Sequence, residues 1–252
     1  MMKKKIAVLA LGLMAGLFSG QEADAMVASG PTAYAELDWS TFSLVGVNIG
    51  LGLPTYTWEY QYDSSDALAG IVYDNDFQNN WTIGTSAEVF GSYAYAETTT
   101  SSVNAYSSLD FDEASNASSS SSRYGQLTVT GTGLLVATID YSWKVTLNKD
   151  QEGVQSSDTQ CYLGLSGKNS QAVGQGYSNG HLPPWSGPVS YFEEDSGKLV
   201  AALYVVDGMV VDFNAYASSS VSAAPVPVPA AAWLLGSGLF GLLAAKRRKI
   251  QA

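Results

Sequence analysis

Several stretches of the chain alternate apolar and polar residues with a period of two, which places one set of side chains on each face of a β-strand. The longest example is "ATIDYSWKVTLN", in which one face would carry Ala137, Ile139, Tyr141, Trp143, Val145 and Leu147. In "TYTWEYQY" the aromatic residues Tyr56, Trp58, Tyr60 and Tyr62 alternate with polar ones. Similar alternation runs through "ELDWSTF", "AEVFGSYAYAE", "VNAYSSLDF" and "QLTVTGT". A helix would scatter both sets, so these patterns predict strands.

The connections between these strands are rich in turn-forming residues. Asp207-Gly208 lies between two β-branched runs in "ALYVVDGMVVDFNA" and predicts a tight β-hairpin. The serine tract "EASNASSSSSR", residues 113–123, predicts a mobile loop, and "SSSVSAAPVP" after Ala217 predicts a linker. Eight to twelve short strands of this kind predict an all-β fold, an antiparallel β-sandwich with a jelly-roll-like arrangement.

The N-terminus has the features of a secretory signal peptide. Three lysines precede the apolar run "IAVLALGLMAGLF", and the small-residue triplet Ala23-Asp24-Ala25 follows it. We therefore expect cleavage after Ala25 and a mature chain that begins at Met26. An uncleaved start-transfer helix is the alternative, but the run is short of the roughly 20 apolar residues that span a bilayer.

The C-terminus is a second membrane-directed segment. Residues 226–245 carry no charge, and four cations follow them: Lys246, Arg247, Arg248 and Lys249. The sixteen residues from Ala230 to Ala245 would form a single hydrophobic helix of about 24 Å, enough to engage a hydrocarbon core of about 30 Å. By the positive-inside rule the cations stay cytoplasmic and stop transfer, which leaves the preceding domain outside.

The order of these features resembles the PEP-CTERM sorting tail of Gram-negative bacteria that make extracellular polysaccharide. Its opening motif "VPVPA" comprises Val226, Pro227, Val228, Pro229 and Ala230, and "WLLGSGLFGLLAA" and "KRRK" follow. The motif is most similar to the Val-Pro-x-Pro-Ala variant, with Val228 where the common Pro-Glu-Pro motif has Glu. The resemblance implies sorting by an exosortase, a membrane-bound cysteine transpeptidase. It covers about 25 of the 252 residues and implies nothing about the fold of the others.

These segments predict four regions: a signal peptide at 1–25, a β-sandwich domain at 26–217, a Ser/Ala-rich linker at 218–225 and the sorting tail at 226–249. From Met26 to Ala245 five cations face twenty-one carboxylates, a formal charge of −16. Such a surface repels phosphate backbones, so binding to nucleic acid is excluded.

Candidate catalytic groups are few. The chain has one histidine, His181, and no Gly-x-Ser-x-Gly motif, so a serine hydrolase has little support. Glu193 and Asp195 in "YFEEDSGK" have the spacing of a glycosidase carboxylate pair on a strand, but the segment is typical of an exposed turn. We therefore expect no enzymatic activity, with a secreted glycoside hydrolase as the second alternative function.

Metal and thiol chemistry have equally weak signals. "YDNDFQNN" clusters oxygen ligands around Asp74 and Asp76, which makes a structural calcium ion the one cofactor to consider, although the EF-hand pattern fails. A solvated turn is the simpler interpretation of that segment. The lone Cys161 cannot form an internal disulfide, and we expect it to be a buried small apolar residue.

Aromatic residues are the most suggestive feature of the mature region. The Tyr56-Trp58-Tyr60-Tyr62 face is either part of a sandwich core or a platform for stacking sugars, and the core is the simpler interpretation. Trp185 in "LPPWSG" is the candidate for an exposed sugar-stacking residue.

The expected function is therefore that of an exported protein of the cell surface or extracellular matrix. It would have a structural or interaction role in an exopolysaccharide or biofilm matrix, with the polysaccharide and the exosortase as partners. A carbohydrate-binding module is the first alternative. Exposed aromatics in a groove would favour that module, whereas paired buried carboxylates with a raised pKa would favour an enzyme.

Overall fold

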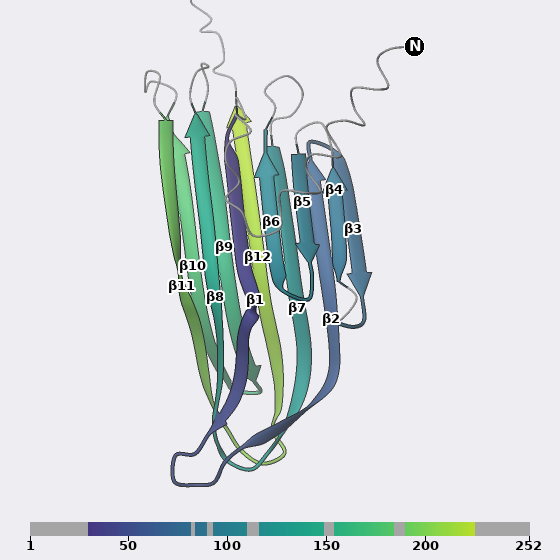
Figure 1. Cartoon of the computed structure of the whole chain (residues 1–252), viewed down its shortest axis with the longest axis vertical. Helices are drawn as coiled ribbons and strands as arrows, with labels where there is room; N and C mark the ends of the chain where they lie inside the picture. Colours follow the sequence, from purple (N-terminus) through teal and green to yellow (C-terminus); the bar gives the residue numbers. More distant parts are fainter. Residues whose placement is uncertain are drawn as a thin grey trace, which may run out of the picture.

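The structure, a computed structural model, describes residues 30–81, 84–89, 93–109, 116–148, 154–183 and 190–224. These residues form twelve β-strands in two antiparallel six-stranded sheets (Figure 1). The predicted all-β class is confirmed, and the two sheets agree with a β-sandwich. Among the described residues there is no helix with the length and apolar character needed to cross a membrane.

The first sheet, named the β1 sheet, has the strand order β11-β8-β1-β6-β5-β4. Its strands are β11 (Ser190–Val205), β8 (Gly133–Asn148), β1 (Thr32–Val47), β6 (Ser102–Ser108), β5 (Tyr93–Thr98) and β4 (Thr85–Val89). The second, the β2 sheet, has the order β10-β9-β12-β7-β2-β3. Its strands are β10 (Ser170–Leu182), β9 (Val154–Gly167), β12 (Val210–Ala224), β7 (Asn116–Thr130), β2 (Thr55–Ala69) and β3 (Val72–Gln78).

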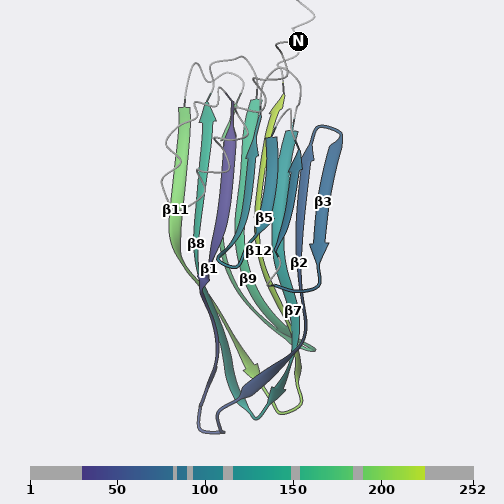
Figure 2. The ribbon, with the colours of Figure 1, turned by 45° about the vertical axis from the view of Figure 1, so that its right-hand side comes forward.

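The strands run along the longest axis of the molecule (Figures 1 and 2). Strand β1 begins and β12 ends at one end, called the upper end, and the β1–β2 loop forms the opposite, lower end. Eight strands have 13 to 16 residues, so the prediction of short strands was wrong for most of them.

The alternation of residues 137–148 is confirmed in β8. Five of its six predicted inward residues are buried, namely Ala137, Ile139, Trp143, Val145 and Leu147, and Tyr141 is half-buried. The burial of these large side chains between the sheets fixes the register of β8, because a slip of one residue would turn all of them to solvent.

The aromatic face of β2 is divided by a β-bulge. The pairing of β2 with β7 shifts between Trp58 and Tyr60, which leaves Glu59 as an extra residue. Tyr56 and Trp58 therefore pack against the core, whereas Tyr60 lies on the outer face. The prediction that these aromatics share one face was wrong, because a single inserted residue reverses the parity of everything after it.

The interior differs between the two halves of the sandwich. The lower half holds large residues, including a cluster of rings formed by Trp39, Phe42, Trp58, Trp81 and Phe213. In the upper half, the interior between β6, β7 and β12 holds mainly Ala and Ser, such as Ala105, Ser107, Ser119 and Ser219, whereas β8 keeps large residues such as Trp143 and Leu147. There β6 and β12, from opposite sheets, bring Cα atoms within 8 Å of each other, closer than the usual sheet spacing of about 10 Å.

Serine hydroxyls bridge the narrow gap between the sheets. Ser119 donates to the carbonyl of Tyr106 across the gap at 2.9 Å, and Ser121 donates to that of Asn104 at 2.6 Å. Ser107 donates in the other direction, to the carbonyl of Ser219 at 3.1 Å. These hydroxyls are thus satisfied although they are buried, which removes the main cost of placing serine inside a protein.

Two serine-rich segments therefore belong to strands. Residues 116–123 of the predicted mobile loop form the first half of β7, and residues 218–224 of the predicted linker form the end of β12. Both predictions were wrong for these residues. Their small side chains fit the narrow gap between β6, β7 and β12, and β7 and β12 pair along nearly their whole length, from Ser222–Asn116 to Val210–Thr128.

The Asp207-Gly208 turn exists, but it does not make a hairpin. Gly208 has a φ of 75°, and the amide of Met209 donates to the carbonyl of Val206 at 3.0 Å. The turn joins β11 of one sheet to β12 of the other, so the two strands do not pair. The hairpin prediction was wrong because Asp-Gly determines a reversal of the chain, not which sheet receives the next strand.

Candidate functional site

The outer face of the β2 sheet carries a regular array of small polar side chains. Its two central strands, β7 and β12, place Ser118 opposite Ser220 and Ser120 opposite Ser218. Larger side chains stand on the neighbouring strands, with Leu68 and Asp66 of β2 on one side and Asp158 and Gln160 of β9 on the other. A row of small residues between rows of larger ones leaves a trough along the sheet.

This serine trough has a volume of about 390 Å³ and is open to solvent. Its wall on the β3 side includes Tyr73, which is 58% exposed and donates a hydrogen bond to Asp66. On the β10 side Tyr177, 66% exposed, is the register neighbour of Gln160. The trough thus has a hydroxyl-lined floor with an exposed aromatic residue beside each wall.

Further down the same face lies a smaller hollow of about 250 Å³. Its lining includes Tyr124, Tyr162, Asp212 and Asn214. Tyr124 stacks on Tyr62 with ring centroids 4.9 Å apart, and Tyr162 stacks on Tyr216 at 4.8 Å. In each stacked pair one ring covers a face of the other. A ligand in the hollow would therefore meet mainly ring edges and hydroxyl groups.

The trough offers the chemistry that recognises sugars. Serine and tyrosine hydroxyls both donate and accept hydrogen bonds, and carboxylates accept them, which matches the hydroxyl groups of a glycan. Leu68 and Tyr73 add apolar surface for the C–H faces of a sugar ring. An open trough suits an extended polymer better than a small molecule, which needs a pocket that encloses most of its surface.

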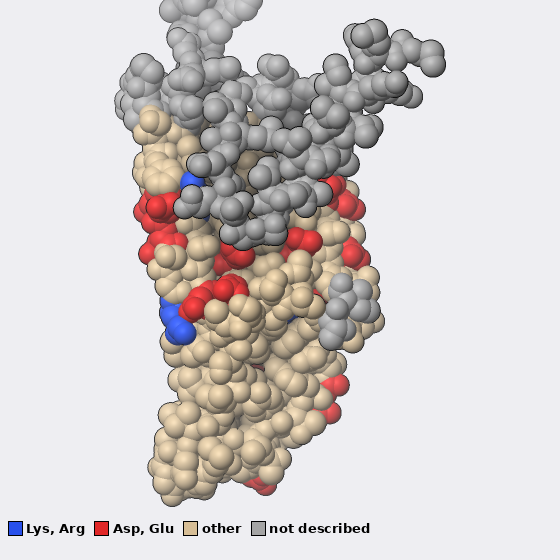
Figure 3. All heavy atoms as spheres, viewed as in Figure 1, with Lys and Arg blue, Asp and Glu red and all other residues tan. Residues whose placement is uncertain are grey.

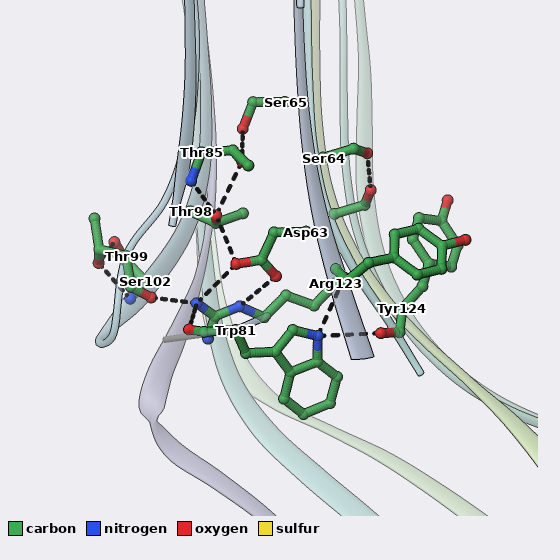
Figure 4. A network of polar contacts seen from close by, with 12 residues as sticks. Asp63, Ser64, Ser65, Trp81, Thr85, Thr98, Thr99, Ser102, Arg123 and Tyr124 are labelled. Atoms are coloured by element: carbon green, nitrogen blue, oxygen red, sulfur yellow. Dashed lines mark hydrogen bonds and ion pairs between the residues drawn. The ribbon is translucent and has the colours of Figure 1, made fainter. Parts of the chain in front are cut away.

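A second polar cluster is entirely internal (Figure 4). Asp63 of β2 and Arg123 of β7 form an ion pair in which Nε and Oδ1 lie 3.1 Å apart, and both side chains are 0% exposed. Thr98 of β5, in the opposite sheet, donates to Asp63 at 3.0 Å. Arg123 Nη2 donates to the carbonyls of Trp81 at 3.2 Å and Thr99 at 2.5 Å.

Burial opposes both charges of this pair. It raises the pKa of Asp63 and lowers the pKa of Arg123, although each group partly compensates the other. The guanidinium also lies 4.4 Å from the ring centroid of Trp39. Because the pair has no access to solvent, its chemistry is structural: it ties the two sheets together between the aromatic and the serine-rich halves of the interior.

Asp74 and Asp76 connect the edges of the two sheets. They lie in β3, so the predicted solvated turn was wrong for residues 73–78 of that segment. Asp74 accepts a hydrogen bond from the amide of Glu88 at 3.0 Å, and Asp76 accepts one from the amide of Ser86 at 3.3 Å. In the part of the chain that the structure describes, no three His, Cys, Asp or Glu residues gather as metal ligands. The two hydrogen bonds instead make Asp74 and Asp76 a latch between the sheets, a pair of side chains that occupies two amides of edge strand β4.

Glu193 has a similar position at the other edge. The segment "EEDSGK" lies inside β11, so its predicted turn was wrong. Glu193 accepts hydrogen bonds from Ser178 of β10 at 2.5 Å and from Tyr191, and these bonds lower its pKa. The general acid of a glycosidase needs a raised pKa, whereas the pKa of Glu193 is lowered, so Glu193 does not fit that role. Asp195 instead accepts a bond from Tyr141 at 2.7 Å.

The other predicted site residues are distributed as follows. Trp185, the signal-peptide residues Ala23 and Ala25, and the tail with its motif and cations lie outside the described residues. His181 is exposed near the end of β10, and its register neighbour is Ser156. Cys161 is buried as predicted, and burial raises the pKa of its thiol to about 12.

The serine trough itself was missed by sequence reasoning. Its floor comes from the two segments that were predicted to be a loop and a linker. One signal was present in the sequence. Leu127 and Val129 predict that the odd-numbered residues of this strand point inward, and counting back in steps of two places the even-numbered Ser118 and Ser120 on the outer face.

Comparisons of the chain with protein-family models, with curated proteins and with solved structures found no match.

Proposed function

We propose that this chain is an exported protein of the cell surface or extracellular matrix that contacts polysaccharide through the serine trough. The signal peptide at 1–25 would direct export. The tail at 226–249 would form a hydrophobic helix that holds the protein transiently in the inner membrane, with its C-terminus cytoplasmic, until an exosortase processes it. The role is structural or one of interaction, without catalysis.

The observation that carries the proposal is the trough on the β2 sheet. Its floor of four serines and its walls with Asp66, Asp158 and Tyr73 match an extended, hydroxyl-rich polymer. The acidic surface of the exported region argues for a neutral or basic glycan over an anionic one. Seven of the eleven strand connections pass between the sheets, which supports the jelly-roll-like description of the domain.

Filling the trough tests polysaccharide contact. We expect Ser120→Phe with Ser218→Phe to weaken co-sedimentation with the native exopolysaccharide by about tenfold or more, since two rings would occupy the space of the glycan. Ser142→Phe with Ser196→Phe on the β1 sheet is the matched control and should bind as the wild type does. Equal binding by both double variants would refute the assignment of the trough.

Intact mass spectrometry of the protein recovered from the native cell surface and medium tests the sorting proposal. We expect a species that begins at Met26 and ends near Val226–Pro229, with or without added mass. A chain that still ends at Ala252 would refute processing and make the tail a permanent anchor.

A dedicated carbohydrate-binding module is the second candidate, and the tyrosines beside the trough favour it. Isothermal titration with defined oligosaccharides separates the two functions. A module should bind one oligosaccharide selectively at micromolar concentration or tighter, whereas a matrix component should bind only the long polymer, through many weak contacts.

A further inference from the structure

The lower end of the molecule exposes a group of aliphatic side chains. In the β1–β2 loop Ile49, Leu51 and Leu53 are 45%, 61% and 62% exposed. The neighbouring β11–β12 turn adds Val206 and Val210, which are also exposed. These five residues are called the apolar tip.

The parts of the apolar tip are held together by contacts at the β7–β8 turn. The amide of Gly131 donates to the carboxylate of Asp207 at 2.8 Å, which joins this turn to the β11–β12 turn. Gly131 is also so close to the β1–β2 loop that an added Cβ would lie 3.4 Å from the carbonyl oxygen of Leu53. These contacts hold the β1–β2 loop and the β11–β12 turn close together at the lower end.

Charge is nearly absent from this end. Residues 43–54 contain no Asp, Glu, Lys or Arg, and on the face drawn in Figure 3 the lower end is mostly uncharged while carboxylates spread over the upper part. The carboxylates that border the tip along the chain are Asp207, which already accepts a hydrogen bond, and Asp212, which lies two residues after Val210 and also accepts one. An exposed apolar group in an otherwise acidic protein marks an interaction site.

The loop also satisfies part of its own backbone. Asn48 Oδ1 accepts hydrogen bonds from the amides of Gly50 at 2.7 Å and Gly52 at 3.3 Å. Both glycines have positive φ, 95° and 120°, so the loop can curl around the Asn48 side chain. The transfer of a backbone amide from water to an apolar medium costs less free energy when the amide already donates a hydrogen bond within the protein.

We propose that the apolar tip inserts into the surface of a lipid bilayer. The tip projects from the end of the molecule and has no aromatic or arginine anchor, whereas protein interfaces depend on such anchors and bury roughly 800 Å² per partner. Five partly exposed aliphatic residues offer much less area. A bilayer accepts an apolar projection of any shape, and its uncharged lipids meet no opposing charge at the tip.

The position of the apolar tip makes the bilayer a separate contact from the chain ends. Strand β12 ends at Ala224 at the upper end, while the tip lies at the lower end of the long axis (Figure 1). The proposal does not depend on the serine trough or on sorting, and it extends the function from polysaccharide to a second surface.

A fluorescent label at the tip provides the test. In Leu51→Cys the new thiol is exposed, while the native Cys161 is buried and resists labelling, so a nitrobenzoxadiazole dye can be placed at one position. Gln175→Cys, exposed at the middle of β10, is the control. The full chain is then mixed with phosphatidylcholine vesicles, with and without brominated acyl chains.

We expect the dye at position 51 to shift to the blue with vesicles and to be quenched by the brominated chains, and the dye at position 175 to do neither. Adding Ile49→Ser and Leu53→Ser should raise the half-saturating lipid concentration about tenfold or more. An unchanged dye at position 51 would overturn the proposal. So would a blue shift without vesicles: if it grows with protein concentration a second copy covers the tip, and if it does not, another segment of the same chain does.

Discussion

At the scale of residues, the part of the chain that the structure describes has one fully buried ion pair, Asp63–Arg123. Asp63 and Arg123 are both fully buried, and burial disfavours the charged form of each, raising the pKa of Asp63 and lowering the pKa of Arg123. Their bonds to each other, to Thr98 and to two backbone carbonyls replace the lost water. Within the described residues Nη1 of Arg123 has no partner, so this replacement is incomplete.

Removing one member of the pair should be far more costly than removing both. We expect Arg123→Met to lower the free energy of unfolding by about 3–5 kcal/mol, because Asp63 would remain buried without a partner. Asp63→Leu with Arg123→Met should cost much less. Urea unfolding measures both.

The surface pair Lys198–Asp140 is the control for that experiment. Its atoms lie 3.3 Å apart, but the side chains are 56% and 42% exposed, so Lys198→Met should cost less than about 1 kcal/mol. An equal loss in Arg123→Met and Lys198→Met would contradict the importance of burial.

Glu193 should make the stability depend on pH. Its hydrogen bonds hold its folded-state pKa below its ordinary value of 4.5, so its contribution is complete above pH 4.5 and is lost as pH falls through the folded pKa. The melting temperature of Glu193→Gln should therefore lie slightly below that of the wild type at pH 6 and approach it near pH 3. Glu194→Gln, on the outer face, should follow the wild type, and a constant difference for Glu193→Gln over this range would argue against the effect.

Single residues could be predicted only where one physical rule dominates. The burial of Cys161 was predicted because a small apolar residue on the core face of a strand has few other positions. Arg123 was missed because its serine-rich surroundings suggested a loop. Its inward position follows from the parity of Leu127, but the carboxylate that stabilises it comes from Asp63, sixty residues earlier.

At the scale of elements, strand edges determine how well the sandwich is closed. Edge strand β4 has free amides on the side away from β5, and Asp74 and Asp76 of β3 occupy two of them. Side chains thus replace the missing neighbour strand and hinder pairing with another molecule.

Removing this latch should loosen one edge. We expect Asp74→Ala with Asp76→Ala to cost about 1–2 kcal/mol and to speed amide hydrogen exchange at Ser86 and Glu88. Asn75→Ala is the matched control, because Asn75 lies between the two aspartates and is exposed on the outer face. Unchanged exchange at these two amides in the double variant would show that the latch does not stabilise this edge.

Strand prediction succeeded where large side chains alternate and failed where serines do. β8 was predicted because its inward residues are large and apolar. β7 and the end of β12 were missed because serine favours turns locally, and only the narrow gap between the sheets makes it a core residue. The bulge at Glu59 leaves no local signal at all, since it is defined by the partner strand.

For the whole molecule, the uneven thickness of the interior is the main constraint. The part of the upper half between β6, β7 and β12 depends on small side chains, and Ala105 of β6 is 0% exposed where β6 approaches β12. Ala105→Leu should force the sheets apart and cost about 1–3 kcal/mol. Ala202→Leu, on the exposed face of β11, should be close to neutral in the same thermal unfolding experiment, and equal melting temperatures would contradict the tight packing.

The order of strands within the sheets could not be read from the sequence. Turn residues mark where the chain reverses, but the Asp207-Gly208 turn sends β12 into the opposite sheet, between β9 and β7. That choice depends on which faces bury each other across the whole domain, which local patterns do not encode. The trough depends on it, since its floor forms only when β7 and β12 become neighbours.

The central position of β12 also gives the molecule a mechanical direction. β12 is hydrogen-bonded to β7 on one side and to β9 on the other along nearly its whole length, up to the last residues before the tail. Ladder bonds lie across the strand, so a pull along β12 from Ala224 loads them together in shear instead of opening them one at a time. If the proposed tail holds the domain from that end while the proposed polysaccharide contact holds its face, the domain would therefore resist being stretched.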